Sequence, residues 1–238
     1  MLAELFYSTS EDKKKSVEKL IEHSTPSYDF FLMIVLSVTM ASFGLLLDSP
    51  AIVIGAMLVA PVLYPVLSAG MGVVMFNSQL MRRSFFTLGR AVLLALAASF
   101  LVGLFFASSD SLTSTELISR TAPSLLNVAV AVIAGFAGAF ALVKPRLSET
   151  IPGIAISVAL VPPLAASGIG LSLLSGAVIK GALLLFLINV LAVLFASIFV
   201  FSLMNFYIKR RTAEKAIEKE DEKQEEIKEK AEEEVKRG

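Results

Sequence analysis

Two apolar stretches of the chain carry paired prolines and closely spaced glycines at matching places. Residues 54–72 read IGAMLVAPVLYPVLSAGMG, and residues 156–170 read ISVALVPPLAASGIG. A proline removes one backbone donor and clashes with the preceding helical turn, so each stretch is predicted to form a broken helix. Inside a bilayer, the freed backbone groups need partners in the protein or in a water-lined cavity. Two broken membrane helices at corresponding positions are typical of a transport site.

We therefore predict a site for a small solute or ion between the two broken helices, where bare carbonyls and half-helix ends supply partial charges. Alternatively, the prolines only kink a packed bundle and the glycines are helix contacts. For Arg90, extension toward the cytoplasmic interface is favoured over binding an anionic group or capping the C-terminal end of a broken helix. The candidate site residues are Gly55, Pro61, Pro65, Gly70, Arg90, Pro162, Pro163, Gly168 and Asn189.

Several chemistries lack their residues. The chain has no cysteine and one histidine, His23, which precedes the first apolar segment and is predicted to lie at the surface. None of the apolar segments carries a deep carboxylate, and no nucleophile stands beside a base. No glycine-rich phosphate loop with lysine is present. We expect no enzyme, no metal and no cofactor, and a net charge of zero gives no reason to expect nucleic-acid binding.

Six apolar segments predict an all-α integral membrane protein with six transmembrane helices, of which the second and fifth are broken. They cover residues 30–47, 50–76, 84–107, 122–143, 151–175 and 181–207. Each approaches or exceeds the roughly 20 residues that cross a bilayer. A mean hydropathy of +0.76 agrees with this class.

The basic flanks predict the orientation of these spans. Lysines of residues 13–19, Arg82–Arg83, Lys144 with Arg146, and residues 209–211 all fall on one side if there are six spans. By the positive-inside rule, that side is the cytoplasm. The expected location is the cell membrane, with several spans and both termini cytoplasmic.

Charged segments flank the membrane domain of residues 28–208. Residues 1–27 are predicted to be a cytoplasmic arm whose helix, over residues 8–24, has Ser10 as a possible N-cap and one apolar face. Residues 209–238 hold half of the 42 charged residues of the chain and read as a charged cytoplasmic tail. A solvated helix or a disordered tail is favoured there over a coiled coil, because the apolar seam lacks leucine.

The membrane domain is predicted to be two repeats of three helices, residues 28–107 and 122–208. Pro65, Gly70 and Gly72 correspond to residues 98 positions later, which are Pro163, Gly168 and Gly170. An odd number of spans forces the second repeat into the opposite orientation, so the repeats are inverted. The starts of the broken helices supply gate or helix-cap candidates, Asp48, Ser49, Glu149 and Thr150.

The segment GAM-x-x-AP-x-x-x-P, at residues 55–65 and followed by Arg82-Arg83-Ser84, resembles the uncharacterised hydrophobic domain family of bacteria and archaea, domain-of-unknown-function family 389. The run VALVPPLAASGIG in the second half fits the same family, and the resemblance covers residues 28–208. It implies a polytopic membrane protein and supplies neither a substrate nor functional residues.

We interpret the chain as a transporter of an unknown small solute or ion that resides in the lipid bilayer. A narrow gated ion channel is one alternative, since it would use the same broken helices. The other is a non-transporting scaffold that presents its charged tail to a partner. Abundant small residues offer close-packing faces, so a homo-oligomer is expected.

Overall fold

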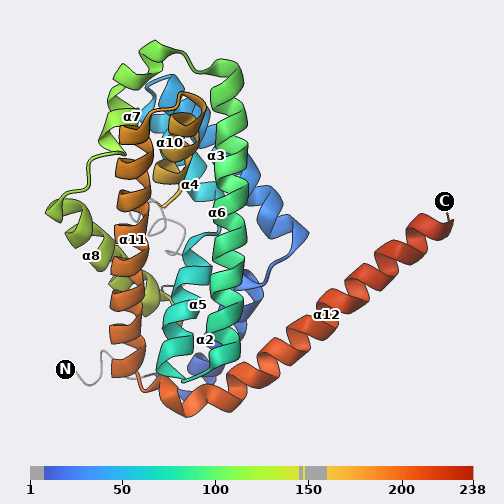
Figure 1. The fold of residues 1–238 in the computed structure, drawn as a ribbon. Coiled ribbons are helices and arrows are strands. Elements are labelled where there is room, and N and C mark those ends of the chain that lie inside the picture. The colour runs from blue at the N-terminus through green and yellow to red at the C-terminus, as the bar shows by residue number, and fades with distance from the viewer. Residues whose placement is uncertain (1–7, 145–146, 148–159, 238) are drawn as a thin grey trace.

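The computed structural model describes residues 8–144, 147 and 160–237, and every regular element in them is helical (Figure 1). The α-helices are α2 (Ser10–Ser24), α3 (Tyr28–Leu46), α4 (Pro50–Val59), α5 (Leu63–Val74), α6 (Ser78–Phe106), α7 (Thr115–Ser119), α8 (Leu125–Val143), α10 (Val161–Ser172), α11 (Gly176–Leu203) and α12 (Arg210–Arg237). Two 3-10 helices, η1 (Ser109–Thr113) and η3 (Phe206–Lys209), follow α6 and α11.

Four of these helices, α3, α6, α8 and α11, are long and apolar enough to cross a membrane. The pair α4 and α5 passes the same test together and bends by 50° at its break, which makes a fifth candidate span. The break expected in the second apolar segment is therefore confirmed. The fifth expected segment, residues 151–175, is described only from residue 160 onward, so its break and the full set of six spans lie partly outside the described residues.

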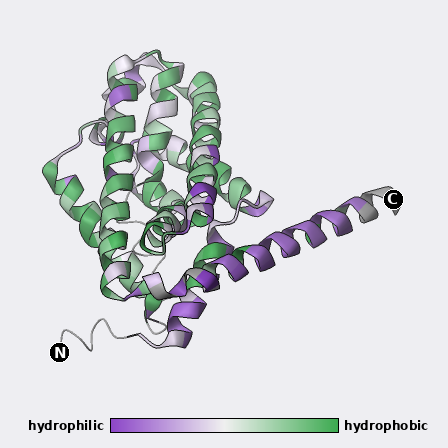
Figure 2. Ribbon diagram, turned by 60° about the horizontal axis from the view of Figure 1, so that its bottom comes forward, coloured by the Kyte–Doolittle hydropathy of each residue, from purple (hydrophilic) through white to green (hydrophobic). Residues whose placement is uncertain are grey.

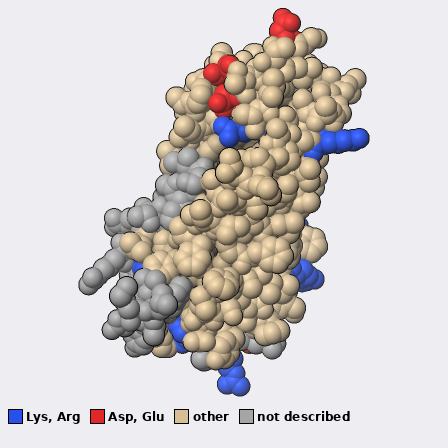
Figure 3. Space-filling model, turned by 90° about the vertical axis from the view of Figure 1, so that its left-hand side faces the viewer, with Lys and Arg blue, Asp and Glu red and all other residues tan. Residues whose placement is uncertain are grey.

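The outside of the bundle is apolar. Large side chains such as Leu93 and Phe195 are exposed by 69% and 67%. Figure 2 shows hydrophobic bundle helices beside a hydrophilic α12, and one flank of the molecule carries few charges (Figure 3). Such a surface suits hydrocarbon rather than water, so the chain is a membrane protein by composition and by surface.

The basic segments meet at one end of the bundle. Ser16 of α2 donates from Oγ to the carbonyl of Leu142 at the end of α8, at 3.1 Å. Arg83 of α6 donates to Thr25 Oγ1 at 3.0 Å, just after α2, and its guanidinium also pairs with Asp221 of α12. These contacts place the flanks of α2, α6, α8 and α12 together, and Figure 1 shows α7 at the opposite end.

The short helices α5 and α10 occupy opposite halves of the bundle, whereas α6 and α11 run its length (Figure 1). Helix α5 packs between α6 and α11, and α10 packs against α6, α11 and α3. Each has 12 residues, and each precedes one of the two longest apolar helices.

The caps of α5 and α10 recur at the same offset of 98 residues. Phe76 and Leu174 both adopt a left-handed φ of 52° after the helix end. The next N–H groups, of Asn77 and Ser175, donate to carbonyls five residues earlier at 3.0 and 2.9 Å. This is the Schellman arrangement, which pairs the last helical carbonyls.

The arm and the tail are both helical next to the bundle. Helix α2 buries Val17, Leu20 and Ile21, which confirms the apolar face expected from the sequence. Its N-cap is Thr9 rather than the expected Ser10, because Thr9 and Asp12 form a reciprocal capping box. The first half of α12 packs on α2, and the remainder extends away from the bundle (Figure 1).

Candidate functional site

The break between α4 and α5 is only a few residues long. Helix α4 ends at Val59, and Ala60 is extended with φ −80° and ψ 123°. Pro61 lies in the break, while Pro65 sits in the first turn of α5, where its missing N–H would have had no helical partner. The two prolines therefore have different roles, and only Pro61 separates the half-helices.

Ser37 pairs one of the carbonyls that this break frees. In a continuous helix the N–H of Ala60 would donate to the carbonyl of Ala56, but Ala60 has left the helix. Ser37 of α3 is fully buried and donates from Oγ to that carbonyl at 2.7 Å. The expectation that bare carbonyls line a site is therefore wrong for Ala56, because the neighbouring helix supplies a donor.

Helix α10 starts at Val161, with Pro162 and Pro163 in its first turn. The second proline pair is therefore a helix start rather than a point within a described helix. Both prolines are buried, and neither can donate a hydrogen bond. This N-terminus offers fewer amide donors than a helix start without proline.

The starts of α5 and α10 meet at one small cavity of about 10 Å³. Its lining is Met57, Ala60, Val62, Leu63, Leu160 and Val161. A space of this size holds about one water molecule. The fold thus brings the first break and the start of α10 together from positions 98 residues apart, and closes them tightly.

Two predicted glycines mark close helix crossings farther along α5 and α10. A Cβ added to Gly70 of α5 would overlap Ser197 Oγ of α11. A Cβ added to Gly168 of α10 would overlap Ser99 Oγ of α6. Both glycines are buried. The two serines are 98 positions apart in the sequence, as are the two glycines. The glycines therefore act as contact points that let the half-helices approach the long helices.

The remaining predicted site residues lie apart from the cavity lining. Gly55 of α4 faces Met40 of α3, with 2.9 Å between the position of an added Cβ and Met40 Cε. Arg90 is exposed on α6, whereas Asn189 is buried on α11. An exposed position for Arg90 fits a side chain that extends along the surface of the bundle.

Asp48 serves a different helix from the one expected. Its carboxylate accepts from Ser114 Oγ at 2.9 Å and from the Glu116 N–H at 2.7 Å, at the start of α7. The backbone N–H of Glu116 is the main cause of a lowered pKa for Asp48. Ser49 occupies the N-cap position of α4, as expected, but its side chain makes no capping hydrogen bond. Glu149 and Thr150 lie outside the described residues.

The arm helix contacts the first turn of α5, a contact that the sequence reading missed. The His23 ring stacks on Tyr64, with 4.6 Å between centroids and 25° between planes. One residue later, Ser24 Oγ donates to Ser68 Oγ at 3.2 Å. No local signal marked this pair, because histidine and tyrosine are 41 positions apart in the sequence. The arm is thereby linked to the half-helix that begins at the cavity.

The stacked histidine predicts a stability loss at mildly acidic pH. His23 is exposed, as expected from the sequence, but the protein around its ring partly desolvates it. This desolvation lowers the pKa of His23 below its usual 6.5, so the unfolded chain binds the proton more readily than the folded chain, by a small margin for an exposed ring. The contribution of neutral His23 to the free energy of unfolding is complete above pH 6.5. It is lost as the pH falls from 6.5 toward the pKa of His23 in the folded protein. Thermal unfolding in detergent at pH 7.5 and 5.5 should show this loss for the wild type and a smaller loss for His23→Phe, which stacks without titrating. An equal loss in both proteins would contradict it.

Comparison with known proteins gives a family without an activity. The family model described as "Domain of unknown function (DUF389)" matches residues 57–195. An uncharacterised protein of Methanocaldococcus jannaschii is 30% identical over an alignment of 204 residues that covers 81% of this chain. The chain spans 62% of the length of that relative. No solved structure matches the chain. The match confirms the family expected from the sequence.

Proposed function

Because the chain belongs to the family of the domain of unknown function 389, whose description names no activity, we propose its function from geometry: passage of a small solute or ion between the two half-helices. The meeting of the starts of α5 and α10 at one cavity carries this proposal. Each start is the positive end of a helix dipole, which favours an electronegative group. Prolines in both first turns reduce the number of amide donors, so contacts to a passing solute would be weak enough for release.

We also propose that the two halves of the membrane domain form an inverted repeat. Recurrent lengths, caps and glycine–serine contacts at an offset of 98 residues are what two related halves would give. The two half-helices run in opposite halves of the bundle and start at the same cavity (Figure 1). In such an architecture, movement of one half against the other exposes a central site to each side in turn.

The orientation and assembly form part of the same proposal. With the basic flanks at one end of the bundle, the positive-inside rule places that end, and both termini, in the cytoplasm. The chain would lie in the cell membrane with six spans and would assemble as a homo-oligomer through its exposed small and apolar side chains.

The natural absence of cysteine allows a direct test. Val62→Cys places one thiol at the cavity, where the wild-type side chain is 3% exposed. Proteoliposomes should pass members of a panel of small anions and polar solutes faster than protein-free vesicles. A methanethiosulfonate reagent should react with Val62→Cys when the cavity opens and should stop most of that flux. Ser109→Cys, exposed in η1 and outside the candidate spans, should react without loss of flux.

Three results would reject the proposal: no flux for any solute of the panel, full reaction at Val62→Cys with unchanged flux, or no reaction at Val62→Cys while flux proceeds. Where flux is found, its concentration dependence separates two mechanisms. Saturable, slow flux indicates a carrier, and fast, linear flux indicates a channel.

A further inference from the structure

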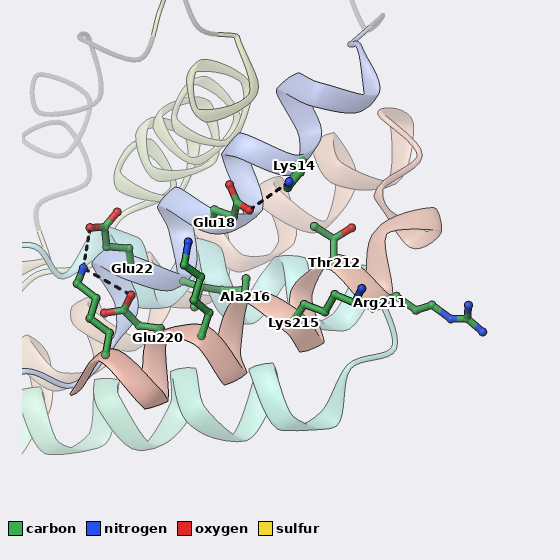
Figure 4. A pocket seen from close by; sticks show the side chains of 11 residues that line it. Lys14, Glu18, Glu22, Arg211, Thr212, Lys215, Ala216 and Glu220 are labelled. Carbon is green, nitrogen blue, oxygen red and sulfur yellow. Dashed lines mark ion pairs between the residues drawn. The ribbon is translucent and has the colours of Figure 1, made fainter. Parts of the chain in front are cut away.

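A basic groove lies between the arm helix α2 and the first half of α12. The groove encloses about 700 Å³ and is lined by Lys14, Glu18, Ile21, Glu22, Arg211, Thr212, Lys215, Ala216, Lys219, Glu220 and Lys223 (Figure 4). The lining thus contains five cations and three carboxylates. The two helices are held together by Ala213 and Ile217 of α12, which are fully buried, so the groove has a packed floor.

Only part of the positive charge is matched. Lys223 lies 3.6 Å from Glu22 and 3.9 Å from Glu220, and Lys14 lies 3.9 Å from Glu18. Within the described residues, Arg211, Lys215 and Lys219 have no carboxylate within 4.0 Å. Figure 4 shows Thr212 and Lys215 beside the groove, whereas Arg211, on the same helix, extends away from the other labelled side chains. Lys215, Lys219 and a hydroxyl group are therefore open to an anion, with Arg211 at the edge of the groove.

These cations share one face of α12. Arg211, Lys215, Lys219 and Lys223 follow one another at intervals of four residues, and each also has a glutamate three residues farther on, at positions 214, 218, 222 and 226. Farther along α12, Lys230 pairs with Glu226 at 3.8 Å. An anion in the groove would add a partner for the cations of the first half that have no carboxylate in contact.

We propose that the α2–α12 groove binds a phosphate-bearing anion. Lysine and arginine recognise phosphate through charge-assisted hydrogen bonds, and a threonine hydroxyl adds a further donor. The groove lies where α11 leaves the bundle, and basic segments next to a membrane helix attract anionic phospholipid headgroups. The phosphate can belong to such a headgroup or to a small phosphate in solution.

Binding to the full-length protein in detergent tests the proposal. Native mass spectrometry with phosphatidylglycerol and with phosphatidylcholine measures lipid binding. Calorimetry with inorganic pyrophosphate measures binding of a soluble phosphate compound. The double variant K215Q/K219Q removes two unmatched cations. The control K228Q/K230Q makes the same charge change on the same helix outside the groove. Thermal unfolding checks that both variants stay folded.

We expect K215Q/K219Q to weaken phosphatidylglycerol binding by about tenfold or more, whereas K228Q/K230Q changes it less than about twofold. The difference should shrink as salt is raised. If pyrophosphate alone shows the same dependence on the groove lysines, the groove binds phosphate from solution and the lipid source is excluded. Two results overturn the proposal. One is an equal loss of binding in both variants, and the other is that neither phosphatidylglycerol nor pyrophosphate binds more tightly than phosphatidylcholine.

Discussion

Gly168→Ala should destabilise the folded protein by about 1–3 kcal/mol or more, because α10 and α6 touch at this glycine. Besides overlapping Ser99 Oγ, the new Cβ would lie 2.7 Å from Ser99 Cβ and 2.8 Å from the backbone nitrogen of Phe100. A backbone atom cannot rotate away, so the helices must separate. Thermal unfolding in detergent should show a lower Tm, by roughly 2–4 °C per kcal/mol for a chain of this size.

Gly70→Ala is the matched comparison, because Gly70 holds the corresponding position 98 residues earlier. There the added Cβ would overlap only Ser197 Oγ, while Ser197 Cβ would be 3.2 Å away and the nitrogen of Ile198 3.5 Å away. A hydroxyl can change rotamer at small cost. We therefore expect Gly70→Ala to lower the Tm less than Gly168→Ala, and equal effects would show that the close approach at Gly168 is not backbone-limited.

Ser37→Ala should cost about 1–3 kcal/mol, because it leaves the carbonyl of Ala56 buried without its donor. This carbonyl stands at the end of α4, one turn before the break. The loss should appear as a lower Tm, and hydrogen exchange should increase at amides of α4 before those of α6.

Ser42→Ala is the control on the same helix. Ser42 is equally buried, but its hydroxyl donates at 2.8 Å to the carbonyl of Val38 within α3, a group that already accepts from the helix backbone. Its removal should change the Tm little. If Ser42→Ala were as destabilising as Ser37→Ala, the pairing of the break carbonyl would not explain the effect.

The sequence alone predicted features that depend on neighbouring residues. Apolar length predicted the spans, Pro61 predicted the break after Val59, and the period of Val17, Leu20 and Ile21 predicted the buried face of α2. Each follows from backbone sterics or from helical spacing within a few residues. The family followed from a motif that is also local.

Features that depend on contacts across the chain could not be predicted in this way. Asp48 looked like a cap for the helix that follows it, yet its acceptor atoms meet the start of α7, 66 or more positions away. The sequence did not indicate that Ser37 would donate to the carbonyl of Ala56, because serine is common in helices and its partner lies on another helix. A solvated helix or a disordered tail was expected from residue 209 onward, but Ala213 and Ile217 are fully buried and α12 packs on α2 of the same chain.

The sequence by itself determined that the chain is an apolar, helical membrane protein with a proline-made interruption, because hydropathy and proline geometry act within one segment. Only the tertiary structure decided that the starts of α5 and α10 share one small cavity, that glycines at positions 70 and 168 meet serines, and that α2 and α12 form a basic groove. Those facts depend on the packing of side chains from distant segments, which no local pattern specifies.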